Sequence, residues 1–145
     1  MTAADSRHTG AAGERVFPAS VAVVPDVIAL IAAEAGAWGL HPRRVRQLEL
    51  AVEEAVVNIC LYAYAPLAGE LVVRVEPGAE RFVVELIDEG VPFDPLTVGD
   101  PDLSSCVEER AVGGLGIFLA RRVVDELAYR RDASRNVLSL AMGRT

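Results

Sequence analysis

The chain has 145 residues and a mass of 15.5 kDa, the size of one ordinary domain, and 52% of its residues are apolar, enough to build a core. The net charge of −7 and the pI near 4.8 argue against nucleic acid as the main partner. All 14 basic residues are Arg, and the absence of Lys excludes P-loop NTPases, eukaryotic-type protein kinases and Schiff-base enzymes in their usual forms.

Residues 1–14 are small and polar, and they are predicted to be a disordered tail that precedes a single domain over 15–145. The tail lacks the apolar stretch of a signal peptide, and no window of about 18 residues is apolar without a charge, so we expect no membrane-spanning helix. The two Cys, Cys60 and Cys106, form no CxxC pair. A reduced, cytoplasmic setting is the simpler interpretation.

A short edge strand is predicted over 15–22, ending at Pro18 or soon after. Pro25 suits the first turn of a helix, and Gly36 and Gly39 are expected to stop that helix.

A second helix is predicted over 43–61, after Pro42. Its apolar residues recur with a period of 3.6: Val45, Leu48, Val52, Val56 and Ile59.

Two alternating runs, 71–75 and 82–86, are separated by Pro77 and Gly78 and predict an antiparallel hairpin. The segment 90–113 shows little periodicity, and a loop of that length inside a small domain is usually functional or mobile.

A third helix over 114–126 and two strands over 127–131 and 136–142 complete the chain. This order predicts an α+β fold, a two-layer α/β sandwich with helices on one face of a mixed, mostly antiparallel sheet.

Three motifs carry chemistry. Glu54 and Asn58 stand four residues apart on the second helix, so they share one face. A carboxylate there can take a proton from an attacking hydroxyl, and an amide oxygen can bind a hard cation such as Mg²⁺. The same spacing also fits a solvated Glu and a chance Asn.

The second motif, 88–95, begins where an apolar strand ends. The Asp88 carboxylate can accept a hydrogen bond from an amino group such as that of adenine, and Gly90 lets the backbone approach a flat ring. An ordinary turn after a strand uses the same residue types.

The third motif precedes the last helix, where exposed N–H groups can bind phosphate, although a short Gly cluster also fits a hinge: Gly113, Gly114, Leu115 and Gly116.

Taken together, the order and spacing of these motifs resemble the GHKL-type (Bergerat-fold) ATPases. Within that superfamily the chain most resembles the bacterial anti-sigma-factor serine kinases, the RsbW and SpoIIAB type, over nearly its whole length. The stretches that carry this resemblance are Phe17-Pro18-Ala19-Ser20, the N-box 49–58, Phe93-Asp94-Pro95, the Gly cluster 113–117 and Val124-Asp125-Glu126-Leu127.

The resemblance implies that Glu54 is the general base, Asn58 the Mg²⁺ ligand and Asp88 the acceptor for adenine. Gly90 would lie against the base, and Gly113, Gly114, Leu115 and Gly116 would lie at the phosphates. It also makes 96–112 the ATP lid, from which Arg110 either reaches a phosphate or remains solvated. Asn136 falls near the place where relatives carry a Thr beside adenine.

The chain departs from the family at one triplet. Relatives usually carry His-Ala-Tyr shortly after the N-box, and this chain carries Tyr62-Ala63-Tyr64.

The implied activity is an ATP- and Mg²⁺-dependent protein serine kinase. The implied partners are a STAS-type anti-anti-sigma protein as substrate, a sequestered sigma factor and a second copy in a homodimer, with no direct contact to nucleic acid or membrane. The alternative is a nucleotide-binding anti-sigma switch with little or no kinase activity.

Overall fold

The computed structural model describes residues 7–8, 13–63, 69–92 and 120–143. In chain order its elements are β1 (Arg7–His8), β2 (Glu14–Pro18), a 3₁₀ turn η2 (Val21–Val23), helix α1 (Val24–Trp38), helix α2 (Pro42–Asn58), a π-helical turn η3 (Ile59–Ala63), β3 (Glu70–Pro77), β4 (Arg81–Asp88), β5 (Glu126–Asp132) and β6 (Arg135–Gly143). Residues 120–123 are also helical.

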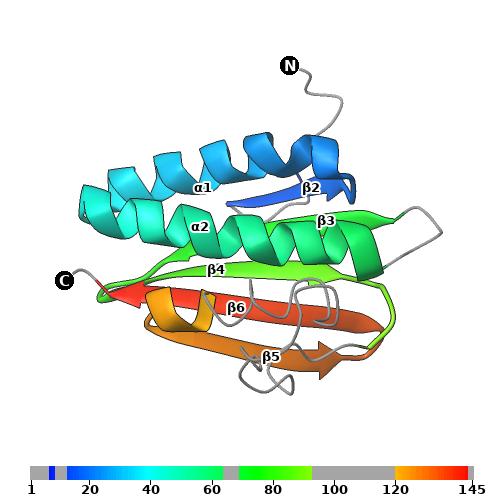
Figure 1. The fold of residues 1–145 in the computed structure, drawn as a ribbon. Coiled ribbons are helices and arrows are strands. Elements are labelled where there is room, and N and C mark those ends of the chain that lie inside the picture. The colour runs from blue at the N-terminus through cyan, green and yellow to red at the C-terminus, as the bar shows by residue number, and fades with distance from the viewer. Residues whose placement is uncertain (1–6, 9–12, 64–68, 93–119, 144–145) are drawn as a thin grey trace, which may run out of the picture.

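The described strands form one sheet in the order β1-β2-β3-β4-β6-β5, and each neighbouring pair is antiparallel. Helices α1 and α2 lie side by side over one face of this sheet (Figure 1). The two-layer arrangement and the β3–β4 hairpin are as predicted. The parallel pairing that a mixed sheet requires is absent among the described strands.

The core lies between this helical layer and the sheet. The predicted apolar face of α2 is confirmed, because Leu48, Val52 and Val56 are fully buried. Val45 and Ile59 pack at the margin of the same core. The alternating strand residues that face the helices complete the core: Leu71, Val73, Val75, Phe82, Val84, Leu86, Leu138, Leu140 and Met142. This packing fixes the rotation of α2 and therefore the direction of its polar residues.

Three details of the predicted elements differ from the structure. Helix α1 continues through Gly36, so a stop at that glycine was wrong, but its last residue is Trp38 and the predicted stop at Gly39 is confirmed. Gly39 caps the helix with a φ of 105°, the left-handed conformation that glycine adopts freely. Strand β2 is not at the edge, because β1, inside the predicted tail, pairs with it. The last helix ends before residue 126, where β5 begins.

Among the described residues, one segment, Val21–Trp38, is long and apolar enough to cross a membrane by length and composition, although we expected none. It has a mean hydropathy of 1.7 and contains Asp26 and Glu34. This is weak grounds for a membrane span, since a core helix of a water-soluble domain passes the same test. Here α1 buries one stripe of its surface in the core: Val24, Val27, Ile31 and Ala35.

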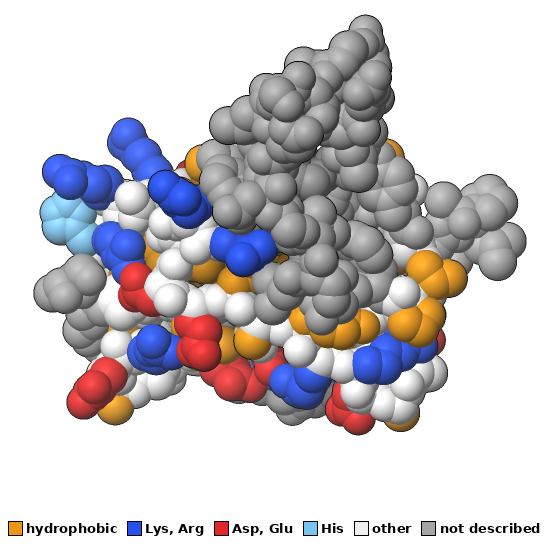
Figure 2. All heavy atoms as spheres, turned by 60° about the horizontal axis from the view of Figure 1, so that its bottom comes forward, with side chains coloured by type: hydrophobic (Ala, Val, Ile, Leu, Met, Phe, Trp, Pro, Cys, Tyr) orange, Lys and Arg blue, Asp and Glu red, His pale blue; other side chains and the backbone are white. Residues whose placement is uncertain are grey.

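The sheet face opposite the helices carries linked ion pairs. Arg74 contacts Glu85 at 2.7 Å and Glu14 at 3.3 Å, and Arg130 contacts the second oxygen of Glu85 at 3.3 Å. Basic and acidic side chains are intermixed on the side of the molecule seen in Figure 2.

A further ion pair joins α2 to the turn before β5. The Asp125 carboxylate accepts hydrogen bonds from Arg44 Nη2 at 2.6 Å and from the Gly143 N–H at 2.5 Å. Burial acts to raise the pKa of Asp125, but the Gly143 and Arg44 hydrogen bonds, with the charges of Arg44 and Arg81, outweigh it and hold the pKa below its usual value.

Asp125→Asn is therefore expected to unfold at a lower temperature than the wild type at pH 7. A carboxylate whose pKa is depressed by folding stabilises the protein above its unfolded-state pKa, and this contribution is lost as the pH falls through the folded-state pKa, below about 4. Thermal unfolding between pH 7 and pH 3 measures the difference, which should shrink as the pH falls. A difference of equal size across that range would contradict the assignment.

Candidate functional site

The end of α2 presents the first predicted pair. Glu54 and Asn58 lie one helical turn apart, are both half-buried and stand outside the row of fully buried residues. Asn58 is the last residue of α2, and the backbone widens into η3 directly after it. Such π-helical turns frequently occur at functional sites.

The second predicted residue, Asp88, ends β4 and is 5% exposed. Its Oδ1 accepts hydrogen bonds from the Gly90 N–H at 2.8 Å and from Asn136 Nδ2 at 2.9 Å. Asn136 is its register partner on β6. The carboxylate is therefore held by its own turn and by the neighbouring strand.

Asn136 is the centre of a larger network. Its Nδ2 also donates to the Val91 carbonyl at 2.9 Å, and its Oδ1 accepts from the Tyr129 hydroxyl at 2.6 Å and from Arg131 Nη1 at 3.1 Å. Arg131 Nη1 donates in addition to the Gly90 carbonyl at 3.0 Å. Tyr129 and Arg131 were not predicted as site residues, because the only signal that they carry is the alternation along a short strand.

Gly90 joins the Asp88 turn to the end of the α2–η3 segment. A methyl group at position 90 would stand 2.2 Å from the Ala63 carbonyl oxygen, and the Val91 N–H donates to that same oxygen at 3.2 Å. The end of α2 and the end of β4 accordingly lie on the same side of the molecule (Figure 1). The structure thus requires glycine here for a close backbone contact, whether or not a ring lies against it.

Gly90→Ala is expected to lower the free energy of unfolding by about 1–3 kcal/mol, because backbone atoms of η3 would have to move to admit the methyl group. Chemical denaturation measures this. Gly36→Ala is the matched control: nothing lies within 4 Å of its added methyl group, so helix propensity should raise the stability by up to about 1 kcal/mol. Equal unfolding curves for Gly90→Ala and the wild type would contradict the contact.

Several predicted residues lie outside the described part of the chain: Gly113, Gly114, Leu115, Gly116, the predicted lid 96–112 and Arg110. The backbone of Tyr62 is described and forms part of η3.

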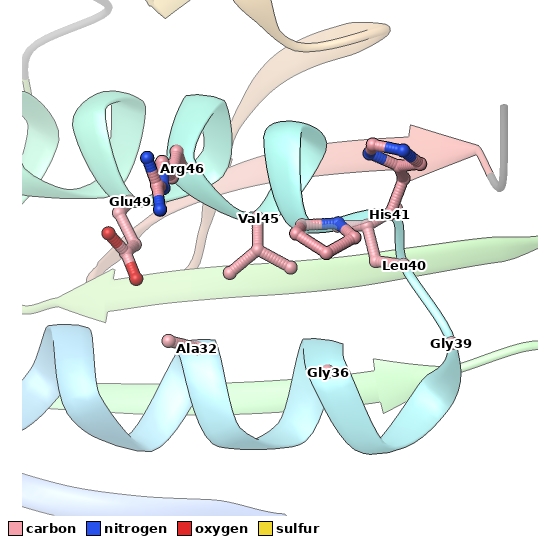
Figure 3. A pocket seen from close by; sticks show the side chains of 9 residues that line it. Ala32, Gly36, Gly39, Leu40, His41, Val45, Arg46 and Glu49 are labelled. Carbon is pink, nitrogen blue, oxygen red and sulfur yellow. The ribbon is translucent and has the colours of Figure 1, made fainter.

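A separate groove of about 740 Å³ lies where the C-terminal part of α1 meets the start of α2, at the opposite end of α2 from Asn58 (Figure 3). Its lining is largely apolar, with Arg46 and Glu49 from α2 and His41 from the connection. None of the predicted site residues lines this groove.

Comparison with known proteins identifies the fold and its family. The family model for the histidine kinase-like ATPase domain matches residues 17–142, and the chain belongs to this family. Among solved structures, it is similar to the histidine kinase domain of the blue-light activated kinase of Erythrobacter litoralis EL346, with a TM-score of 0.54 and 17% identity over 88% of this chain and 62% of that one. It is also similar to the Acinetobacter baumannii histidine kinase AdeS, with a TM-score of 0.51 and 14% identity over 91% and 68% of the two chains.

Curated relatives give a narrower comparison. The chain is 28% identical over 129 residues to a serine-protein kinase RsbW of Bacillus cereus, covering 86% of this chain and 81% of the relative. The RsbW of Bacillus thuringiensis subsp. konkukian matches with the same values. The RsbW-type GHKL family and the α+β sandwich predicted from the sequence are both confirmed.

Proposed function

We propose that the protein is an ATP- and Mg²⁺-dependent serine kinase of the cytoplasm that phosphorylates a STAS-type anti-anti-sigma protein and sequesters a sigma factor. The observation that carries the proposal is the contact between Ala63 and Gly90, which joins the helix end bearing Glu54 and Asn58 to the turn bearing Asp88. The RsbW relatives support the serine-kinase class.

Asp88 is the proposed adenine acceptor. Both hydrogen bonds described for its carboxylate fall on Oδ1, so Oδ2 is the oxygen that would accept the adenine amino group. A charged acceptor in a turn that excludes water binds adenine, which presents an amino group to it. It disfavours a base such as guanine that presents an oxygen at the same place.

Asn58 is the proposed Mg²⁺ ligand, through its amide oxygen. The described residues contain no cluster of three or more His, Cys, Asp or Glu that could hold a metal. A single amide oxygen fits Mg²⁺, a hard cation that binds oxygen ligands, keeps several waters and is held in large part by the phosphates of its substrate. When bound, the ion would neutralise charge on the phosphates. The Gly cluster 113–116 is the proposed phosphate loop.

Glu54 is the proposed general base. It accepts the proton of the substrate serine hydroxyl as that oxygen bonds to the γ-phosphorus; the bond from γ-phosphorus to the β–γ bridging oxygen breaks, and ADP leaves. Its position one helical turn before Asn58 supports this role, because the base would then lie beside the proposed Mg²⁺ ligand.

The competing function is a nucleotide-binding anti-sigma switch with little or no transfer. One observation favours it: Tyr62 stands where relatives carry a His, in the turn that follows Asn58.

Transfer of labelled phosphate from ATP to a STAS-type protein distinguishes the kinase from the anti-sigma switch. The protein is incubated with γ-labelled ATP and a STAS-type protein, preferably one encoded beside its gene, or with the serine-to-alanine form of that protein. The kinase proposal expects label on the serine form alone, and no label when EDTA removes Mg²⁺. ATP-dependent sigma binding without transfer would favour the switch, and absence of ATP binding would overturn both.

A further inference from the structure

We propose that Asn136 is a positioning residue for Asp88 that makes no contact with the base itself. Held by Tyr129 and Arg131, it fixes which oxygen of the Asp88 carboxylate is presented to the ligand and thereby sets the preference for adenine. This inference rests on the proposed nucleotide site and adds a base-selecting network that reaches the edge strand β5.

The Asn136 amide is fully used by protein partners. Its two N–H groups donate to Asp88 Oδ1 and to the Val91 carbonyl, and its oxygen accepts from Tyr129 and Arg131. An amide has two donors and two acceptor positions, so no capacity remains for a nucleobase. The residue that falls near the Thr beside adenine in relatives therefore acts on the base only through Asp88.

The orientation of this amide is determined by its partners. A flipped amide would set its oxygen against Asp88 Oδ1 and the Val91 carbonyl, both acceptors, and would set its N–H groups toward the Arg131 guanidinium, which only donates. Asn136 is itself 5% exposed, so an unmade hydrogen bond here is not replaced freely by water. A donor is thus held permanently against one oxygen of Asp88.

The sheet register brings these residues together. Asp88 on β4 pairs with Asn136 on β6, which pairs with Arg131 on β5, so the three form one row across the sheet. Tyr129 lies two residues before Arg131 on β5, on the same strand face. Arg131 also ties the Gly90 carbonyl to this row. The row, through Asn136, and the turn, through the Gly90 N–H, therefore both donate to Oδ1 of Asp88.

The test measures the affinities for ADP and GDP by displacement of a fluorescent nucleotide, so that no turnover is involved. Asn136→Asp keeps the shape but places a carboxylate where Asp88 needs a donor, and we expect ADP affinity to fall by about tenfold or more, with the ADP-to-GDP affinity ratio moving toward one. Arg131→Gln and Tyr129→Phe should shift the ratio in the same direction by about threefold.

Arg130→Gln is the matched control, because Arg130 lies on the opposite face of β5 and contacts Glu85. It should leave the ratio unchanged. Thermal unfolding without nucleotide shows which variants fold, and if Asn136→Asp does not, Tyr129→Phe and Arg131→Gln decide the question.

The outcomes separate the two proposals. If the wild type binds ADP in preference to GDP, and the folded variants keep the same ratio, the positioning role is wrong and the proposed function stands. If the wild type binds neither nucleotide, the proposed function fails, and the positioning role fails with it.

Discussion

Glu54→Gln is expected to slow phosphoryl transfer to the serine substrate by about 10²–10⁴-fold, the usual contribution of a general base. Glutamine keeps the size of the side chain and its half-buried place on α2 but cannot accept the proton. ATP affinity should change little, because adenine and Mg²⁺ are assigned to Asp88 and Asn58. Single-turnover transfer at saturating ATP measures the chemical step directly.

The neighbouring Glu53 offers the matched control, since it is exposed on the same helical turn. Glu53→Gln removes the same charge from the same part of α2, so it should transfer phosphate at the wild-type rate. Sequestration of a sigma factor should survive in Glu54→Gln, because it depends on binding. Transfer by Glu54→Gln at the wild-type rate would show that another group is the base.

Local patterns predicted much of the fold. The alternation around Pro77 and Gly78 specifies a hairpin by itself, and the 3.6-residue period of α2 specifies its buried face. The end of α1 was harder to predict because it contains two glycines. Trp38 lies between them, and its Nε1 donates to the Gly78 carbonyl at 2.7 Å while its ring packs 5.8 Å from that of Phe82. These tertiary contacts accompany the continuation of the helix past Gly36.

The residues of the candidate site also differ in how far the sequence alone could predict them. Glu54 and Asn58 could be found from spacing on one helix, and Asp88 from its place at the end of a strand. Arg131 and Tyr129 could not, because their relation to Asp88 depends on the register of β5 and β6 with β4. The role of Gly90 was equally hidden, since its close neighbour Ala63 is far away in the sequence. Contacts that depend on strand register, or on two segments far apart in the chain coming together, produce no pattern among neighbouring residues of the sequence.

Asp88→Asn is expected to weaken ATP binding by about 10–10²-fold and to reduce the preference for ATP over GTP. The reason lies in the two N–H donors that the protein holds against this side chain. Gly90 N–H and Asn136 Nδ2 both point at Oδ1, so the new amide must keep its oxygen there and place its NH₂ group where Oδ2 stood. The NH₂ group of the new amide then faces the adenine amino group, and two donors repel each other. A guanine carbonyl oxygen at that place would instead accept a hydrogen bond from the NH₂ group.

Competition calorimetry with ATP and GTP measures both affinities, and thermal unfolding without nucleotide shows whether the variant is folded. Asp132→Asn is the control, because Asp132 is an exposed carboxylate at the end of β5, on the opposite strand face from Arg131, and should leave both affinities unchanged. The two substitutions remove the same charge, so a loss confined to Asp88→Asn comes from the position of the acceptor and not from the net charge. Equal binding of ATP and GTP by the wild-type protein would mean that Asp88 does not read the base.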